Sequence, residues 1–184
     1  MSRDVTPLGD ELPPAREVVA ELQRALREPG HRPDGSLVGL LVDLLRSNLA
    51  QWNLESHARD PDADADAVAH TKRAIDELNT RRHHLVEAID AAIDGSLAQT
   101  ASAPLATESP GMAFDRLSVL VIRVHHTELA AGEGAPDAGV YTKRLPVLHR
   151  QLADLEHAID NLVEDVRHGR RRFVPYQSMK LYRS

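Results

Sequence analysis

Residues 145–166 read LPVLHRQLADLEHAIDNLVEDV, and this segment carries the clearest structural signal in the chain. Its apolar residues recur in alternating steps of three and four, which places them in one narrow seam along a helix. The seam consists of Leu145, Leu148, Leu152, Leu155, Ile159, Leu162 and Val166. Gly169 follows Arg167 and His168, and a glycine after basic residues is typical of a helix C-terminus. A seam of this kind has to pack against other helices, so it predicts a helical bundle.

Four further segments have helical periodicity, and no segment reads convincingly as a strand. Ser109 is a candidate cap for one of them, and Pro110 suits a first helical position. The four are the segment after Pro13–Pro14, residues 37 to about 59, about 67–94, and the segment from 110. The sequence therefore predicts an all-α protein, an antiparallel bundle of about five helices. We expect one domain over residues 1–184, divided into an N-terminal helix and linker (1–33), the bundle core (34–168) and a basic, aromatic tail (169–184).

The composition limits the classes of function. The 184 residues are 42% hydrophobic and only 3% aromatic, with no cysteine and a formal net charge of −6. The absence of cysteine excludes disulfides, thiolate nucleophiles and Cys-ligated metals, and the negative charge argues against nucleic acid as a partner. No apolar run approaches the length that spans a membrane. We expect a soluble, cytoplasmic protein that binds neither membrane nor nucleic acid.

Two predicted helices carry polar residues where their apolar pattern points inward. On the third, Asn79 and Arg82 fill a gap in an otherwise aliphatic stripe, so both should face the core. On the second, four residues follow one another at spacings of four, three and four and share one face. These are Asn48, Trp52, Glu55 and Arg59. An ion-paired rim is one explanation for this face, and the wall of a charged pocket that faces Arg82 is the other.

The fourth helix is apolar on nearly every side between Phe114 and Val124, yet it contains charged residues. Asp115 and His126 share one face, and we expect them to line a cavity together with Trp52, Glu55 and Arg59. Arg123 and His125 should lean toward the surface. Because burial of a charge is costly without a partner or a ligand, polar groups on three inward faces predict a site inside the bundle.

At these same residues the chain resembles a bacterial family known as domain of unknown function 4254. The first matching block is NLAQWNLESHARDP (48–61), with a one-residue difference in spacing before Gln51. The second comprises Lys72, Ile75, Asp76, Asn79, Arg82, Val86, Glu87, Ile89 and Asp90. The third comprises Thr107, Glu108, Pro110, Asp115, Arg116, Leu117 and Ser118, with His126 downstream. The tail block comprises Tyr176, Met179, Lys180 and Tyr182. The resemblance supports this choice of residues and implies no particular chemistry.

Our leading hypothesis is an enzyme or binder of bacterial, biosynthetic metabolism. Its ligand is a small anion bearing a carboxylate or phosphate, bound in an Arg/Glu/His-lined pocket inside the helical bundle. Guanidinium groups suit such anions, and the ligand-binding candidates are Asn48, Trp52, Arg59, Asn79, Arg82 and Arg116. The catalytic candidates are Glu55, Asp115 and His126, which would perform acid–base chemistry of the lyase, isomerase or hydrolase type. The chain lacks a Gly-rich phosphate loop and a G-x-S-x-G elbow, and we expect no cofactor.

Two alternatives remain open. In the first, the protein is a structural or interaction module that forms a homodimer through the 145–166 seam, and the inward charges are ion pairs. In the second, it is a metal-dependent helical enzyme whose ligands are Glu55, Glu87, Asp90 and His126. The H-E-x-x-H motif and the paired Glu-x-x-His motifs of di-iron bundles are both absent, which weakens the metal hypothesis.

Overall fold

A computed structural model of the chain describes residues 12–33, 36–57, 65–132, 134 and 137–178. These residues form five helices and no strand, only an isolated bridge between Leu105 and Arg172. The helices are α1 (Ala15–Arg27), α2 (Leu37–His57), α3 (Ala65–Ser96), α4 (Pro110–Ala130) and α5 (Ala138–Arg167). They contain 13, 21, 32, 21 and 30 residues, more than half of the 184-residue chain. The prediction of an all-α bundle is confirmed.

The helix ends follow the chemistry of their terminal residues. At the start of α4, the Ser109 side chain accepts a hydrogen bond from the backbone N–H of Met112, and Pro110 is the first helical residue. After α5, Gly169 has φ 67°, in the left-handed region that a glycine adopts without strain. Both ends are as predicted. α3 is longer than predicted by two residues at each end, within the usual uncertainty of helix boundaries.

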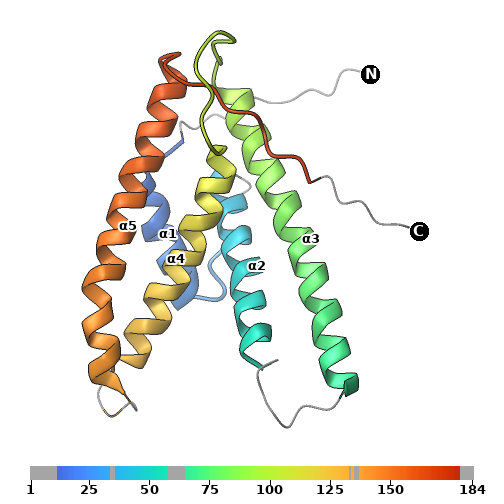
Figure 1. The fold of residues 1–184 in the computed structure, drawn as a ribbon, viewed down its shortest axis with the longest axis vertical. Helices are drawn as coiled ribbons and strands as arrows, with labels where there is room; N and C mark the ends of the chain where they lie inside the picture. Colours follow the sequence, from blue (N-terminus) through green and yellow to red (C-terminus); the bar gives the residue numbers. More distant parts are fainter. Residues whose placement is uncertain (1–11, 34–35, 58–64, 133, 135–136, 179–184) are drawn as a thin grey trace.

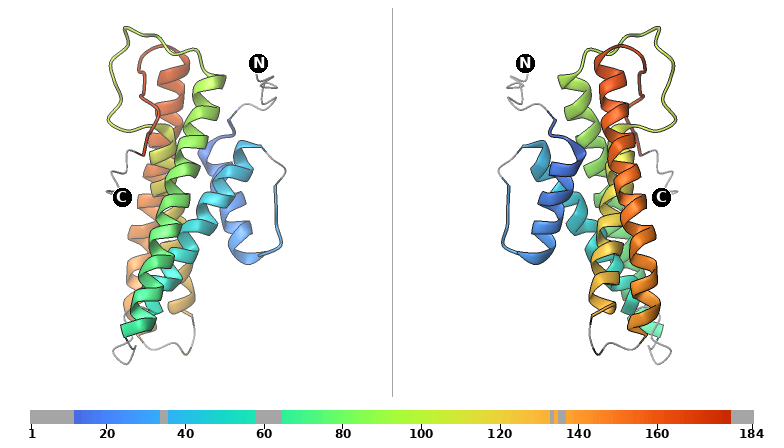
Figure 2. Two further views of the ribbon diagram at one scale, coloured as in Figure 1. Left: turned by 90° about the vertical axis from the view of Figure 1, so that its right-hand side faces the viewer. Right: turned by 90° about the vertical axis from the view of Figure 1, so that its left-hand side faces the viewer.

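The helices are arranged with α4 in the middle of one broad face and with α3 and α5 on either side of it (Figure 1). α2 and α4 run in one direction, and α3 and α5 run in the opposite one. α2 packs on α3 and α4, while α1 lies on the back of the molecule and contacts α2, α4 and α5 (Figure 2). Within the described ranges α3 and α5 do not pack against each other. One face of α4 therefore remains uncovered between them.

The core lies between α4 and the helices around it. Phe114, Leu117 and Ile122 of α4 are at most 1% exposed, and they pack with equally buried aliphatic residues of α1, α2 and α3. The first turn of α1 is tied to α5, because the backbone N–H of Ala15 donates to the Asp160 carboxylate at 2.8 Å. No described helix combines the length and the apolar character needed to cross a membrane.

The chain after α5 turns back and runs along α3. This C-terminal strap (residues 172–178) first pairs with the loop before α4, through hydrogen bonds between Arg172 and its neighbours Pro104 and Ala106. The Phe173 side chain is buried in the core. Side chains of α3 and the residues after it then accept the strap's backbone N–H groups. The pairs are Phe173 with Gln99, Tyr176 with Asp90 and Ser178 with Glu87, at 2.7, 2.8 and 2.5 Å.

Candidate functional site

A buried polar cluster joins three helices at the middle of the bundle. The Asp115 carboxylate on α4 accepts two hydrogen bonds from Arg82 Nε, at 2.9 and 3.0 Å, and one from Nη2 at 2.5 Å. Asn48 Nδ2 on α2 donates to Asp115 Oδ1 at 2.9 Å and to Ser118 Oγ at 2.7 Å. The Ser118 hydroxyl in turn donates to the Asp115 backbone carbonyl. The inward placement of Asn48, Arg82 and Asp115 predicted from their apolar stripes is found in the structure.

This cluster fixes the orientation of the Arg82 guanidinium. The Asp115 side chain is only 9% exposed, whereas that of Arg82 is 32% exposed. The hydrogen bonds that Arg82 donates to Asp115 raise the pKa of Arg82, although burial acts in the opposite direction. Because both oxygens of the carboxylate are engaged, Arg82 is held as a rigid fork with one edge against Asp115 and the other toward solvent.

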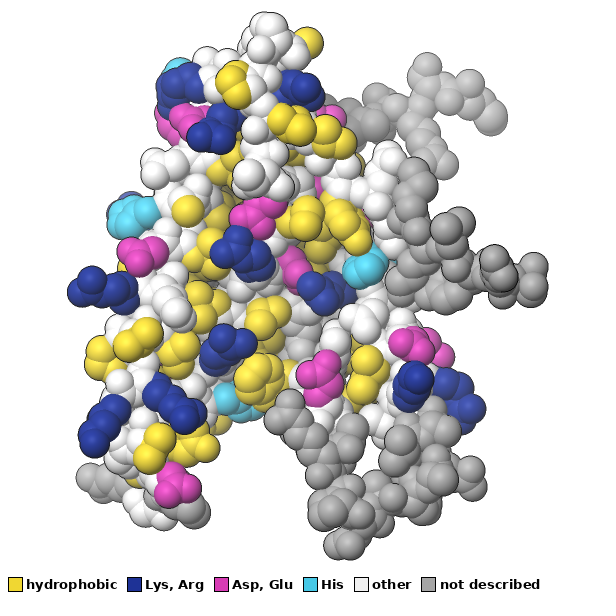
Figure 3. Space-filling view, in the orientation of Figure 1, with side chains coloured by type: hydrophobic (Ala, Val, Ile, Leu, Met, Phe, Trp, Pro, Cys, Tyr) yellow, Lys and Arg dark blue, Asp and Glu magenta, His cyan; other side chains and the backbone are white. Residues whose placement is uncertain are grey.

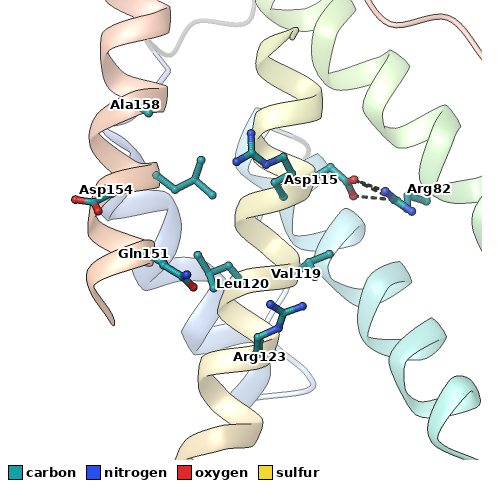
Figure 4. Close-up of a pocket in the computed structure, with 10 residues that line it drawn as sticks. Arg82, Asp115, Val119, Leu120, Arg123, Gln151, Asp154 and Ala158 are labelled. Carbon is teal, nitrogen blue, oxygen red and sulfur yellow. Dashed lines mark hydrogen bonds and ion pairs between the residues drawn. The ribbon is translucent and has the colours of Figure 1, made fainter. Parts of the chain in front are cut away.

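A groove of about 680 Å³ lies on the uncovered face of α4, between α3 and α5. Basic and apolar side chains gather together in the middle of this face (Figure 3). In the close-up, Asp115 points from α4 toward Arg82 of α3, and Gln151 of α5 stands on the opposite wall (Figure 4). The lining residues are Arg82, Asp115, Arg116, Val119, Leu120, Arg123, Gln151, Asp154, Leu155 and Ala158.

Three of the groove's side chains are guanidinium groups, and they differ in their partners. Arg82 pairs with Asp115 as described. Arg116 Nη1 donates to the Glu108 carboxylate at 2.5 Å. Arg123 is exposed, as predicted, and has no ion pair with any residue that the structure describes. Arg123 nevertheless lines the groove, because the groove lies on the exposed face of α4.

A second, smaller cavity of about 190 Å³ lies on the other side of Arg82 and Arg116. Its remaining walls come from α3, α4 and the strap. The residues that line it are Arg82, His83, Val86, Glu108, Met112, Asp115, Arg116 and Tyr176. The Tyr176 hydroxyl lies 3.3 Å from His83 Nδ1, and the two rings meet edge to face with centroids 5.6 Å apart. The sequence interpretation selected neither residue for the site, although Tyr176 belongs to the tail block of the family pattern.

His126 lies away from the groove, in a stack with Trp52 of α2. The two rings are nearly parallel, at 4° and with centroids 5.4 Å apart. Burial lowers the pKa of His126, and the neighbouring His125 adds to this effect. His126 Nε2 is buried and has no hydrogen-bond partner in the described part of the chain. Neither His126 nor Trp52 lines the groove or the smaller cavity that Asp115 lines. His126 and Trp52 stack on each other, while Asp115 faces Arg82.

The remaining predicted site residues are dispersed. Glu55 is exposed on α2, where Gln51 Nε2 donates to it at 3.0 Å, and it does not line the groove. Asn79 is half-buried on α3, likewise outside the lining of both cavities. Arg59 falls outside the described residues. A pattern of spacings identifies a shared helix face, but Glu55 lies two turns beyond Asn48, too far along α2 to reach the same partners.

The four residues of the metal hypothesis do not come together. Both oxygens of Asp90, which is fully buried, accept backbone N–H groups, one from Gly111 at 2.6 Å and one from Tyr176 at 2.8 Å. Glu87 accepts the N–H of Ser178 and lies 3.4 Å from His84. Among the described residues, no three acidic or histidine side chains are grouped closely enough to hold a metal ion. Asp90 and Glu87 instead fasten the strap to α3.

Comparison with known proteins gives a family and no activity. No curated protein and no solved structure matches the chain. One family model matches residues 39–174, a range that includes the polar cluster, all the residues that line the groove and the first part of the strap. The protein therefore belongs to the family described as "Protein of unknown function (DUF4254)".

Proposed function

We propose that the groove binds a small anionic molecule that carries a carboxylate or a phosphate group. The observation that carries this proposal is the presence of three guanidinium groups, Arg82, Arg116 and Arg123, along one groove of about 680 Å³. Pockets for small ligands typically enclose roughly 300–1,000 Å³. Val119, Leu120 and Leu155 provide an apolar surface beside the charges, so a ligand with an apolar body and an anionic head fits this surface best.

The fixed conformation of the Arg82 side chain strengthens the proposal. A flexible arginine loses side-chain entropy when it binds an anion, at a cost of up to about 2 kcal/mol. Arg82 is already held by three hydrogen bonds to Asp115, so most of that entropy is lost on folding rather than on binding. Asp115 and Asn48 would then act on the ligand through Arg82, as positioning residues.

The geometry supports the binding part of this hypothesis more strongly than acid–base catalysis. Asp115 is engaged by Arg82 and Asn48, and Glu55 lies outside the groove. His126 is eleven residues beyond Asp115 on α4, about 16 Å along the helix axis. A lyase, isomerase or hydrolase reaction in the groove would need a different proton donor, and His83 lines the smaller cavity together with Arg82.

Ligand-induced stabilisation tests the proposal. A saturating ligand at a hundred times its Kd stabilises the native state by about 2.7 kcal/mol, which raises the Tm of a chain of this size by roughly 5–10 °C. We expect phenyl phosphate or benzoate to produce such a shift. Arg123→Gln should reduce it, and because Arg123 is exposed the substitution should leave the Tm of the unliganded protein unchanged.

Arg81→Gln is the matched control for this experiment. Arg81 is exposed on α3 and lines neither cavity, so its replacement removes the same charge at another place. Equal losses of the shift in Arg123→Gln and Arg81→Gln would assign the effect to overall charge and refute the groove. The proposal also fails if no carboxylate or phosphate compound raises the Tm.

A second candidate function is self-association through α5. The 145–166 seam consists of two lines of residues with heptad spacing, and the two lines differ in how deeply they are buried. Leu152, Ile159 and Val166 are buried against the rest of the protein. The parallel line is only partly buried and consists of Leu148, Leu155 and Leu162. A second copy that packs on this line would complete the coiled-coil-like seam predicted from the sequence.

Sedimentation velocity distinguishes this candidate. Leu155→Glu should convert a dimer into a monomer if α5 forms the interface. The control is Val174→Glu, because Val174 is 61% exposed on the strap and should tolerate the charge without a change in mass. A monomeric wild-type protein at concentrations of about 100 μM, well above those at which stable dimers form, would eliminate the homodimer.

A further inference from the structure

The two cavities meet at a boundary formed by the same charged side chains. Arg82, Asp115 and Arg116 line both of them. The smaller cavity is too small for a complete drug-sized ligand, since its volume is about 190 Å³ against the roughly 300–1,000 Å³ of typical ligand sites. It has the size of a subsite for one head group, with the larger groove beside it for the rest of the molecule.

Hydrogen-bond donors reach this cavity from three different elements. Arg82 on α3 uses Nε and Nη2 for Asp115, and Nη1 is not part of that pair. Arg116 on α4 uses Nη1 for Glu108, while its Nε and Nη2 are not part of that contact. The strap adds the Tyr176 hydroxyl, which lies beside His83 Nδ1. His83 Nδ1 lies closer to Ser178 Oγ, at 3.0 Å, than to the Tyr176 hydroxyl. The shorter contact engages Nδ1, and the Tyr176 hydroxyl can donate into the cavity that it lines.

We propose that the smaller cavity is a phosphate subsite, in which Arg82, Arg116 and the Tyr176 hydroxyl bind the head group of a small phosphate monoester whose body lies in the groove. This inference rests on the proposed function and specifies its ligand. A phosphate monoester presents three acceptor oxygens in a tetrahedral arrangement. A carboxylate presents two oxygens in one plane, so it matches donors that arrive from three different elements less well than a tetrahedral phosphate does.

The strap makes Tyr176 a specificity residue in this site. Its backbone N–H donates to the buried Asp90 carboxylate at 2.8 Å, and the next strap contact is Ser178 with Glu87. These two contacts hold the backbone at Tyr176 itself and two residues after it against α3. The carboxylates of α3 therefore help to form the subsite through the strap, without facing the anion themselves.

Calorimetric titration of the full chain with two matched probes tests this inference. Phenyl phosphate and benzoate share the phenyl body and differ in the head group. We expect the wild-type protein to bind phenyl phosphate at least about tenfold more tightly than benzoate, the effect of one additional hydrogen bond to a charged group. Tyr176→Phe should weaken phenyl phosphate about tenfold and benzoate less than twofold.

A second variant keeps the test valid if Tyr176→Phe perturbs the strap. Met112 lines the smaller cavity and is 40% exposed, so Met112→Glu should fold and place a negative charge beside the head group. It should weaken phenyl phosphate more than benzoate, whereas the uncharged Met112→Gln should have little effect on either probe. Inorganic phosphate, which lacks the phenyl body, should compete with phenyl phosphate.

The outcomes separate this inference from the proposed function. One outcome would overturn the phosphate subsite and leave the anion-binding groove in place. In it, the wild-type protein binds the two probes with equal affinity, and both affinities fall in Arg123→Gln but not in Tyr176→Phe or Met112→Glu. The absence of binding by either probe would overturn both. Selective loss of phenyl phosphate binding in both Tyr176→Phe and Met112→Glu is the result that supports the subsite.

Discussion

A double-mutant cycle on Arg82 and Asp115 measures how strongly the polar cluster contributes to the fold. Exposed ion pairs contribute about 0–1 kcal/mol, and removal of one partner from a buried pair costs about 3–5 kcal/mol. This pair lies between these limits, because the carboxylate is 9% exposed and the guanidinium is 32% exposed. We therefore expect a coupling free energy of about 2 kcal/mol in urea unfolding.

The two single variants should differ in a defined direction. Arg82→Gln leaves the buried Asp115 with Asn48 as its remaining side-chain donor, so we expect a cost of about 3–4 kcal/mol. Asp115→Asn leaves the Arg82 guanidinium, which can turn toward water, and should cost about 2–3 kcal/mol. Costs that add to within about 0.5 kcal/mol in the double variant, or a larger cost for Asp115→Asn, would refute the argument from burial.

Three further predictions concern other parts of the molecule. Gly111→Ala places a Cβ 2.8 Å from Asp90 Oδ1 and from a backbone carbonyl, and it should lower the free energy of unfolding in urea by about 1–3 kcal/mol. At Gly95 nothing lies within 4 Å of an added Cβ, so Gly95→Ala should raise the free energy of unfolding by about 0.5–1 kcal/mol. Equal effects of the two substitutions would contradict the packing argument. Asp90→Asn turns an amide N–H₂ toward a backbone donor and should cost about 2–4 kcal/mol, whereas Asp76→Asn, at an exposed position of the same helix, should cost less than about 0.5 kcal/mol. Because burial lowers the pKa of His126 from its ordinary 6.5, its contribution to stability is complete above pH 6.5 and is lost as the pH falls below it. As the pH is lowered from 8 to 5.5, the Tm of His126→Phe should therefore rise relative to that of the wild type. A difference in Tm that stays constant with pH would show that His126 does not titrate with unfolding.

The sequence predicted the elements that depend on local chemistry. Ser109, Pro110 and Gly169 act within one turn of the chain, so their effect on helix ends can be judged without knowledge of the fold. The inward direction of Arg82 and Asp115 was also predictable, because each interrupts the apolar stripe of its own helix. These were the residues that the structure brought together.

The sequence could not show which helix each inward face would meet. Asp115 and His126 share a face of α4, yet one meets Arg82 and the other stacks on Trp52, because the neighbours change along a helix 21 residues long. The contribution of the strap to the smaller cavity could not be predicted from the sequence either. Its backbone N–H groups bind α3 side chains, and because any residue other than proline can donate such a bond, the identity of Tyr176 carried no signal of its position.

The buried residues of α5 are distributed unevenly along its length. Leu152, Ile159, Val163 and Val166 are buried, and the first of them is the fifteenth residue of the 30-residue helix. The first 14 residues, 138–151, contribute no buried side chain. This helix is therefore anchored at one end, and its amide hydrogens should exchange fastest near residue 140 and slowest near residue 160. The α5 residues that line the groove are Gln151, Asp154, Leu155 and Ala158, so the wall of the groove begins where the buried residues of α5 begin. Opening of the first turns of α5 should therefore leave both the groove and the polar cluster intact.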